Sequence, residues 1–175
     1  MNIKKILPAL ASMTLVVGLS ACAFDSPTIT DAPPSTDITF ESPSAPEGVG
    51  KFGQVVKWDG VDLTVSKPKA FEPSDTAGGT EKFEHNVSMD VKLTNTGEEP
   101  LDPTLVSVSA SSAEEEAGAV FDVEKKIESG PTTNILPGKS VTWTVAFNVA
   151  DPKDLVVEVS PPDFMMEPVL FSTGG

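Results

Sequence analysis

The sequence contains no arginine. It has 12 lysines and 26 aspartates and glutamates, which gives a formal net charge of −14. Surfaces that bind nucleic acid need several Lys or Arg contacts that neutralise phosphates and release counterions. The missing arginine and the acidic balance therefore argue against a nucleic-acid partner. They also argue against flat adsorption on anionic lipid, which attracts basic segments.

Cysteine and histidine each occur once, at Cys22 and His85. A single cysteine allows no disulfide within the chain, so a folded domain must be stabilised by its packed core. A hydrolytic triad needs a base beside a nucleophile, and no glycine-framed serine accompanies the histidine. No Cys or His pair has zinc-ligand spacing. We expect no enzymatic activity, catalytic residue, metal or cofactor, although carboxylates paired only by the fold would leave no trace in the sequence.

Long apolar runs are also missing, since the apolar stretch at residues 6–19 has 14 residues. A helix needs about 20 residues to cross a hydrocarbon core. Lys4 and Lys5 precede this stretch and Ser20-Ala21 follow it, which is the pattern of a secretory signal. We predict that residues 1–21 are a signal peptide that is removed on export.

The run Leu19-Ser20-Ala21-Cys22 resembles the lipobox of bacterial lipoproteins. The resemblance implies that Cys22 receives a diacylglyceryl group, becomes the mature N-terminus and holds the protein, through palmitate-type chains, on the extracytoplasmic face of the cell membrane. Each buried CH₂ of such a chain contributes about 0.8 kcal/mol to anchoring. The alternative is an ordinary secreted protein with a chance cysteine. Removal of Lys4 and Lys5 with the signal leaves a formal charge of 10 − 26 = −16.

Residues 22–50 have the composition of a disordered linker. Residues 23–50 contain five prolines, eight Ser or Thr and five acids, and no lysine. Apolar residues are scattered there without a period, so the segment is not expected to pack. As a flexible coil, it would span about 30 Å and lift the following domain away from the membrane.

From Lys51 onward, apolar and polar residues alternate with the period of half-buried strands. Asp59-Gly60 predicts a two-residue hairpin turn between two of these strands. In the strand predicted over residues 141–149, Trp143 takes the central inward position, so we expect it in the core. The predicted strands are residues 55–58, 61–65, 83–93, 106–110, 118–123, 141–149, 155–159 and 169–171.

Seven or eight short strands and no amphipathic helix over residues 51–175 predict an all-β domain, an immunoglobulin-like antiparallel β-sandwich. A small barrel is the alternative. The runs VxMDVKLTNTGEEPLDP at residues 87–103 and LPGKSVTWTVAFNVADPKDLVVEVSP at residues 136–161 are similar to a domain of unknown function in Gram-positive, especially actinobacterial, surface lipoproteins. That resemblance implies the fold of immunoprotective extracellular proteins and a surface location, and it supplies no catalytic residues.

Acidic runs offer hard oxygen ligands of the kind that calcium accepts. Such ligands occur at Glu114-Glu115-Glu116 and at Asp151 and Asp154. Neither set matches the glycine-containing calcium-loop pattern, so we interpret both as solvated surface.

Thioethers suit copper(I), and the candidates are Met89, Met165 and Met166 together with His85. Their positions fit core packing better than a metal site. Asn86-Val87-Ser88 matches a glycosylation acceptor, but it lies inside a predicted strand, so we discount it.

The predicted function is that of a lipid-anchored cell-surface protein whose sandwich is a non-enzymatic binding or structural module. Antiparallel sandwiches present sheet faces, edges and clustered loops that extracellular partners recognise. We expect a monomer with an unknown protein or cell-envelope partner. The alternative is a small extracytoplasmic ligand- or cation-binding lipoprotein, accessory to a transporter or cell-envelope enzyme.

Overall fold

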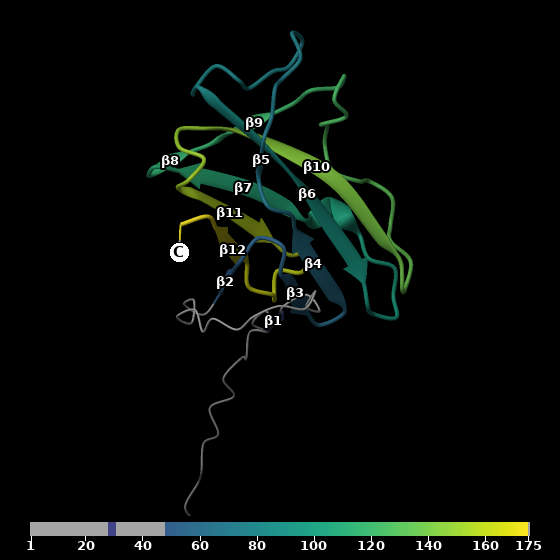
Figure 1. Cartoon of the computed structure of the whole chain (residues 1–175). Coiled ribbons are helices and arrows are strands. Elements are labelled where there is room, and N and C mark those ends of the chain that lie inside the picture. The colour runs from purple at the N-terminus through teal and green to yellow at the C-terminus, as the bar shows by residue number, and fades with distance from the viewer. Residues whose placement is uncertain (1–27, 31–47, 175) are drawn as a thin grey trace, which may run out of the picture.

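The computed structural model describes residues 28–30 and 48–174, and their strands form two sheets packed face to face (Figure 1). One sheet has the strand order β1-β3-β4-β6-β10-β9, with β5 also paired to β6, and the other has the order β2-β12-β11-β7-β8. The strands are β1 (Thr28–Thr30), β2 (Val49–Gly50), β3 (Val55–Trp58), β4 (Val61–Val65), β5 (Lys69–Ala70), β6 (His85–Asn95), β7 (Ser107–Ser112), β8 (Glu115–Glu116), β9 (Gly118–Val120), β10 (Ser140–Val149), β11 (Leu155–Ser160) and β12 (Val169–Ser172).

The predicted immunoglobulin-like β-sandwich is confirmed, and two separate sheets replace the small-barrel alternative. Seven of the described strands have four or more residues, which agrees with the predicted number, and five have two or three. The only helical element in the described residues is a 3₁₀ turn, η1 (Pro103–Leu105), where the chain passes from β6 to β7. No helix in the described ranges is long and apolar enough to cross a membrane.

Strands β6 and β10 form the central pair of the larger sheet, in continuous antiparallel register from Ser140↔Thr94 to Val149↔His85. The alternation predicted for β6 is confirmed, because Val87, Met89, Val91 and Leu93 are buried whereas Asp90 and Lys92 are exposed. These side chains meet the inward faces of β11 and β12, so one apolar core joins the two sheets.

Trp143 is half-buried rather than fully enclosed, which corrects its predicted place in the core. It has the predicted inward parity, since it pairs with buried Val91 and packs against the core. However, β9 covers β10 only at residues 146–148, so the side of β10 next to Trp143 has no flanking strand there. The loop at Gly130 lies against the indole edge instead.

Two hairpins show what turn chemistry predicts and what it misses. The predicted turn at Asp59-Gly60 joins β3 to β4, and Gly60 adopts the φ of +76° that its lack of a side chain permits. The acidic run at residues 114–116 lies outside the predicted strands, but Glu115 and Glu116 form β8. Ala113 and Glu114, with φ of 51° and 64°, make the tight turn before it.

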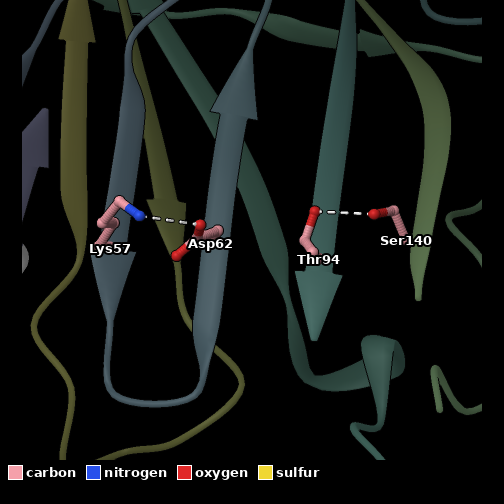
Figure 2. Close-up of polar contacts among 4 residues, drawn as sticks. All are labelled: Lys57, Asp62, Thr94 and Ser140. Atoms are coloured by element: carbon pink, nitrogen blue, oxygen red, sulfur yellow. Dashed lines mark hydrogen bonds and ion pairs between the residues drawn. The ribbon is translucent and has the colours of Figure 1, made fainter. Parts of the chain in front are cut away.

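A row of polar side chains crosses the outward face of the larger sheet (Figure 2). The register places Lys57 opposite Asp62, Asp62 opposite Thr94, and Thr94 opposite Ser140. Lys57 Nζ lies 3.3 Å from Asp62 Oδ2, and the Thr94 and Ser140 hydroxyls are 2.9 Å apart. Exposed pairs of this kind contribute little to stability, but they show that this face is polar where the opposite face is apolar.

Two parts of the predicted linker pair with the sandwich. Thr28–Thr30 form β1, antiparallel to β3, and Val49–Gly50 form β2, parallel to β12. Gly48, just before β2, is also described. The other residues assigned to the linker, the predicted signal at residues 1–21 and Cys22 lie outside the described residues. Their roles stay predictions.

The strands connect at two ends of the sandwich. The Gly60 end comprises residues 59–60, 96–105, 136–139 and 161–168, which follow or precede paired strand ends. The His85 end comprises residues 66–86, 113–114 and 150–154, at the opposite ends of the same strands. Loops gather at both ends, as expected for a sandwich.

Candidate functional site

A groove of about 350 Å³ opens at the His85 end, beside β5 and the start of β6. This volume lies at the low end of the range for ligand pockets. One wall is residues 68–73, the other is residues 84–87, and Pro152 closes part of the rim. The groove contains the chain's single histidine, His85.

Local backbone pairing builds the groove. Lys69 and Ala70 of β5 pair with Ser88 and Val87, and the Phe71 amide donates to the Asn86 carbonyl at 2.9 Å. Pro68 and Pro73, in the same wall, lack an N–H and have a fixed φ. β5 is therefore kept to two residues, and the chain leaves the sheet to form a rigid lip.

The opposite wall is held by Asn148, which is fully buried in β10. Its Oδ1 accepts from the Phe83 amide at 2.6 Å, and its Nδ2 donates to the Phe83 carbonyl at 2.8 Å. The same Nδ2 lies 3.2 Å from the His85 carbonyl and 2.9 Å from Asn86 Oδ1. Residues 83–86 thus gain a fixed conformation although Phe83 and Glu84 lie before the strand.

A buried carboxylate, that of Asp122, fixes the loop that continues from the groove wall. Asp122 accepts from the Ser74 amide at 2.7 Å, from the Ser74 hydroxyl at 2.8 Å and from the Lys125 amide at 3.1 Å. Burial by itself acts to raise the pKa of the Asp122 carboxyl, but the bonds from Ser74 and the amide and charge of Lys125 outweigh it. The pKa therefore lies below its ordinary value.

The same loop covers a small second apolar cluster on the outward face of the larger sheet. Val120, Ile127 and Ala146 are buried there, and Phe71 and Ala77 pack against them. Gly79, with φ +83°, lies so close to the Ala119 carbonyl that a Cβ would collide with it. The backbone at Gly79 thus packs directly against β9. Phe71 contacts this cluster and also lines the groove.

His85 is exposed at the groove, which corrects the inward position that strand parity suggests. It is the first residue of β6, where the sheet opposite no longer covers it. Its neighbours in the groove include Glu72, Glu84 and Lys69, and the lining contains no Ser, Thr or Cys. The arrangement offers charged and hydrogen-bonding contacts to a ligand, without a nucleophile beside the imidazole.

The acidic candidates are used within the fold. Glu115 pairs with Lys82 at 3.9 Å, and Lys82 Nζ also donates to the Glu116 carbonyl at 2.7 Å. Asp151 Oδ1 accepts from the Lys153 amide at 2.9 Å within its own turn. In residues 28–30 and 48–174, no group of three or more His, Cys, Asp or Glu side chains is placed to hold a metal ion.

The methionines do not converge with His85. Met89 is buried in the core between the sheets, and Met166 packs against that core from the Gly60 end. Met165 is exposed at the Gly60 end, far along the strands from the histidine, which corrects its predicted packing. Asn86, the candidate glycosylation residue, lies in β6 and accepts from Asn148 through its side chain.

Sequence reasoning missed Asn148 and Asp122, which shape the site. A polar residue that breaks an apolar run in a strand was the available signal for Asn148, between Phe147 and Val149. Nothing near Asp122 in the sequence distinguishes it from the many exposed acids. Its partner Ser74 is 48 residues away.

Comparison with known proteins supports the fold. The chain matches no protein-family model and no curated protein. The yjhA protein of Bacillus subtilis superposes with a TM-score of 0.55 at 19% identity, over 70% of this chain and 97% of that chain. The ycdA protein of the same species, provisionally assigned as a lipoprotein, gives a TM-score of 0.50 at 18% identity, over 65% of this chain but 36% of that one. At these identities the likeness establishes a shared β-sandwich.

Proposed function

We propose that the protein is a lipid-anchored, extracytoplasmic β-sandwich that acts by contact rather than by catalysis. The observation that carries the proposal is the lipobox-like run ending in Cys22, directly after a complete export signal. The provisional assignment of the structurally similar ycdA protein as a lipoprotein supports it. The groove at His85 supports a role in recognition, because its lining offers polar and apolar contacts without a nucleophile.

Replacement of Cys22 tests the anchor. We expect Cys22→Ala to leave the sandwich folded but to move the protein from the membrane to the soluble fraction, because the acyl chains supply the attachment. Fractionation and labelling with a palmitate analogue measure the effect. Ser26→Ala, which keeps the cysteine, is the matched control and should remain labelled and membrane-bound. An unchanged membrane pool for Cys22→Ala would refute the anchor.

The groove also favours a second function, capture of a ligand for a transporter or cell-envelope enzyme. Pro68, Pro73, Pro152 and Phe71 give it apolar walls. Its charged side chains are Glu72 and Glu84 against Lys69, so negative charge is in excess. A ligand that combines an apolar body with a positive group fits this lining. The two functions differ in what is bound, a released solute or a fixed envelope component, and both use the same anchor.

A further inference from the structure

A tight turn at the Gly60 end presents two large apolar side chains to solvent. Phe164 is 94% exposed and Met165 is 55% exposed. The Met166 amide donates to the Asp163 carbonyl at 3.1 Å, and the Met165 amide donates to Asp163 Oδ1 at 2.9 Å. Aspartate at the first position of a turn commonly makes these bonds, so the tip has a fixed shape. We call residues 163–166 the apolar tip.

The apolar tip is attached to the sandwich on both sheets. Met166 packs against the main core, and Trp58 Nε1 donates to the Glu167 carbonyl at 3.1 Å. Trp58 is the last residue of β3, so the tip lies beside the β3–β4 turn. Leu105 and Leu136 are also exposed at this end, at 52% and 58%. Four of the six exposed large apolar side chains in the described residues therefore belong to the Gly60 end.

Strand β1 brings the N-terminal chain to the same end. Thr28 pairs with Lys57, the residue before Trp58, and β1 runs antiparallel to β3. The chain that precedes Thr28 therefore departs at the Gly60 end. Cys22 is six residues earlier. Six residues span at most about 20 Å even when fully extended.

We propose that Phe164 and Met165 insert into the surface of a zwitterionic lipid bilayer, so that the sandwich stands on its Gly60 end. This inference rests on the proposed lipid at Cys22, which holds the apolar tip within reach of the bilayer. Large apolar side chains on a fixed turn lose little conformational freedom on insertion. Asp163 begins the tip and Glu167 follows it, so a neutral headgroup surface suits the tip better than an anionic one.

A single labelled cysteine tests the insertion in the full lipidated chain. Cys22 is the only natural cysteine, and lipidation consumes it, so Met165→Cys can be labelled alone with an environment-sensitive dye. The probe is a phosphatidylcholine vesicle that contains a spin-labelled phosphatidylcholine quencher. Val123→Cys is the matched control, because Val123 is 72% exposed and follows β9, at the opposite edge of the larger sheet from β1.

We expect the dye at position 165 to shift its emission to the blue and to be quenched, while the dye at position 123 keeps its emission. Addition of Phe164→Ser should reduce the quenching at position 165 without releasing the chain from the vesicle. Substitution of anionic phosphatidylglycerol for part of the lipid should also reduce the quenching at position 165 at low salt.

Flotation of the vesicles separates the possible failures. If the chain floats but positions 165 and 123 give the same emission, insertion is refuted and the anchor stands. If the wild-type chain does not float, the anchor and the insertion are both refuted. Protection of position 165 on whole cells but not on lipid vesicles would assign the tip to a protein partner and would overturn insertion.

Discussion

Two buried asparagines, one at each end of the sandwich, show how single polar residues fix its loops. Asn148 holds residues 83–86 at the His85 end. Asn95 at the Gly60 end donates to the Glu99 and Ile135 carbonyls at 2.7 and 2.8 Å and accepts from the Gly97 amide at 2.9 Å. A buried amide is tolerated only when its donors and acceptors are paired, so each asparagine specifies one loop conformation.

The two tryptophans should differ in their contribution to stability. Trp58 is 5% exposed and makes a hydrogen bond, whereas Trp143 is half-buried. We expect Trp58→Ala to lower the free energy of unfolding by about 3–5 kcal/mol, as for other buried aromatics, and Trp143→Ala by about 2 kcal/mol. Urea denaturation of both variants measures the difference. Equal losses would show that the loop at Gly130 encloses Trp143 more fully than its exposure indicates.

Asp122 predicts a pH dependence of stability. Its pKa is lowered in the folded protein, so its ionised form stabilises the fold above the ordinary aspartate value of about 3.9. That stabilisation is lost as the pH falls through the folded pKa. We expect Asp122→Asn to be less stable than wild type at pH 7 and this gap to narrow below about pH 4.

Urea denaturation between neutral and acid pH measures the difference in free energy of unfolding between wild type and Asp122→Asn. Asp75→Asn, at an exposed position of the same loop, is the control for loss of one negative charge. A gap for Asp122→Asn that stays constant with pH would contradict the assignment.

At the scale of elements, the turn between β7 and β8 is unusual because Ala113 and Glu114 both have positive φ. Tight hairpin turns of this type prefer Asn-Gly, and a residue with a side chain costs roughly 1–2 kcal/mol in the left-handed region. We expect replacement of Ala113-Glu114 by Asn-Gly to raise the free energy of unfolding by about 1 kcal/mol. Glu114→Gln, which removes the charge and keeps the side chain, should change little. An equal gain from Glu114→Gln would assign the effect to charge.

The strands were predictable because their signal is local. Val61, Leu63 and Val65 in β4 alternate with polar residues, and Leu155, Val157 and Val159 in β11 recur with the same period of two. All six are buried. The turn at residues 113–114 was missed because its sequence has no glycine or asparagine to indicate it. The exposure of Trp143 was missed because it depends on where β9 ends, which periodicity within β10 does not report.

The groove was not predictable either, because it depends on contacts between residues that are distant in the sequence. Its walls come from residues 68–73 and 84–87, and the residue that fixes one wall, Asn148, is 65 positions from Phe83. Contacts over such separations depend on sheet order, and a single sequence carries no record of that order. The anchor, in contrast, is a prediction from contiguous residues, because export and lipidation depend on a short linear pattern.

At the scale of the whole molecule, net charge should influence stability. The chain has a formal charge of −14, and the ion pairs of the described residues include Lys57–Asp62 and Lys82–Glu115. Self-repulsion of a highly charged chain destabilises the compact state, and salt screens it. We therefore expect the free energy of unfolding of the Cys22→Ala chain to increase with sodium chloride concentration.

Chemical denaturation by urea across a salt series measures this effect. Substitution of exposed Glu98 and Glu99 by Lys changes the charge by four units and should reduce the gain. A decrease in stability with salt would indicate that the ion pairs outweigh the repulsion.

The pairing of β1 with β3 also has a mechanical consequence. Load between the lipid at Cys22 and a partner at the His85 end would run along the strands and pull β1 past β3 in shear. Three residue pairs hold β1, against ten between β6 and β10, so β1 would detach before the sandwich unfolds. The 17 residues from 31 to 47 would then lengthen the connection by at most about 60 Å. Under an applied force, the distance between the lipid and the sandwich would increase, and the folded domain would stay intact.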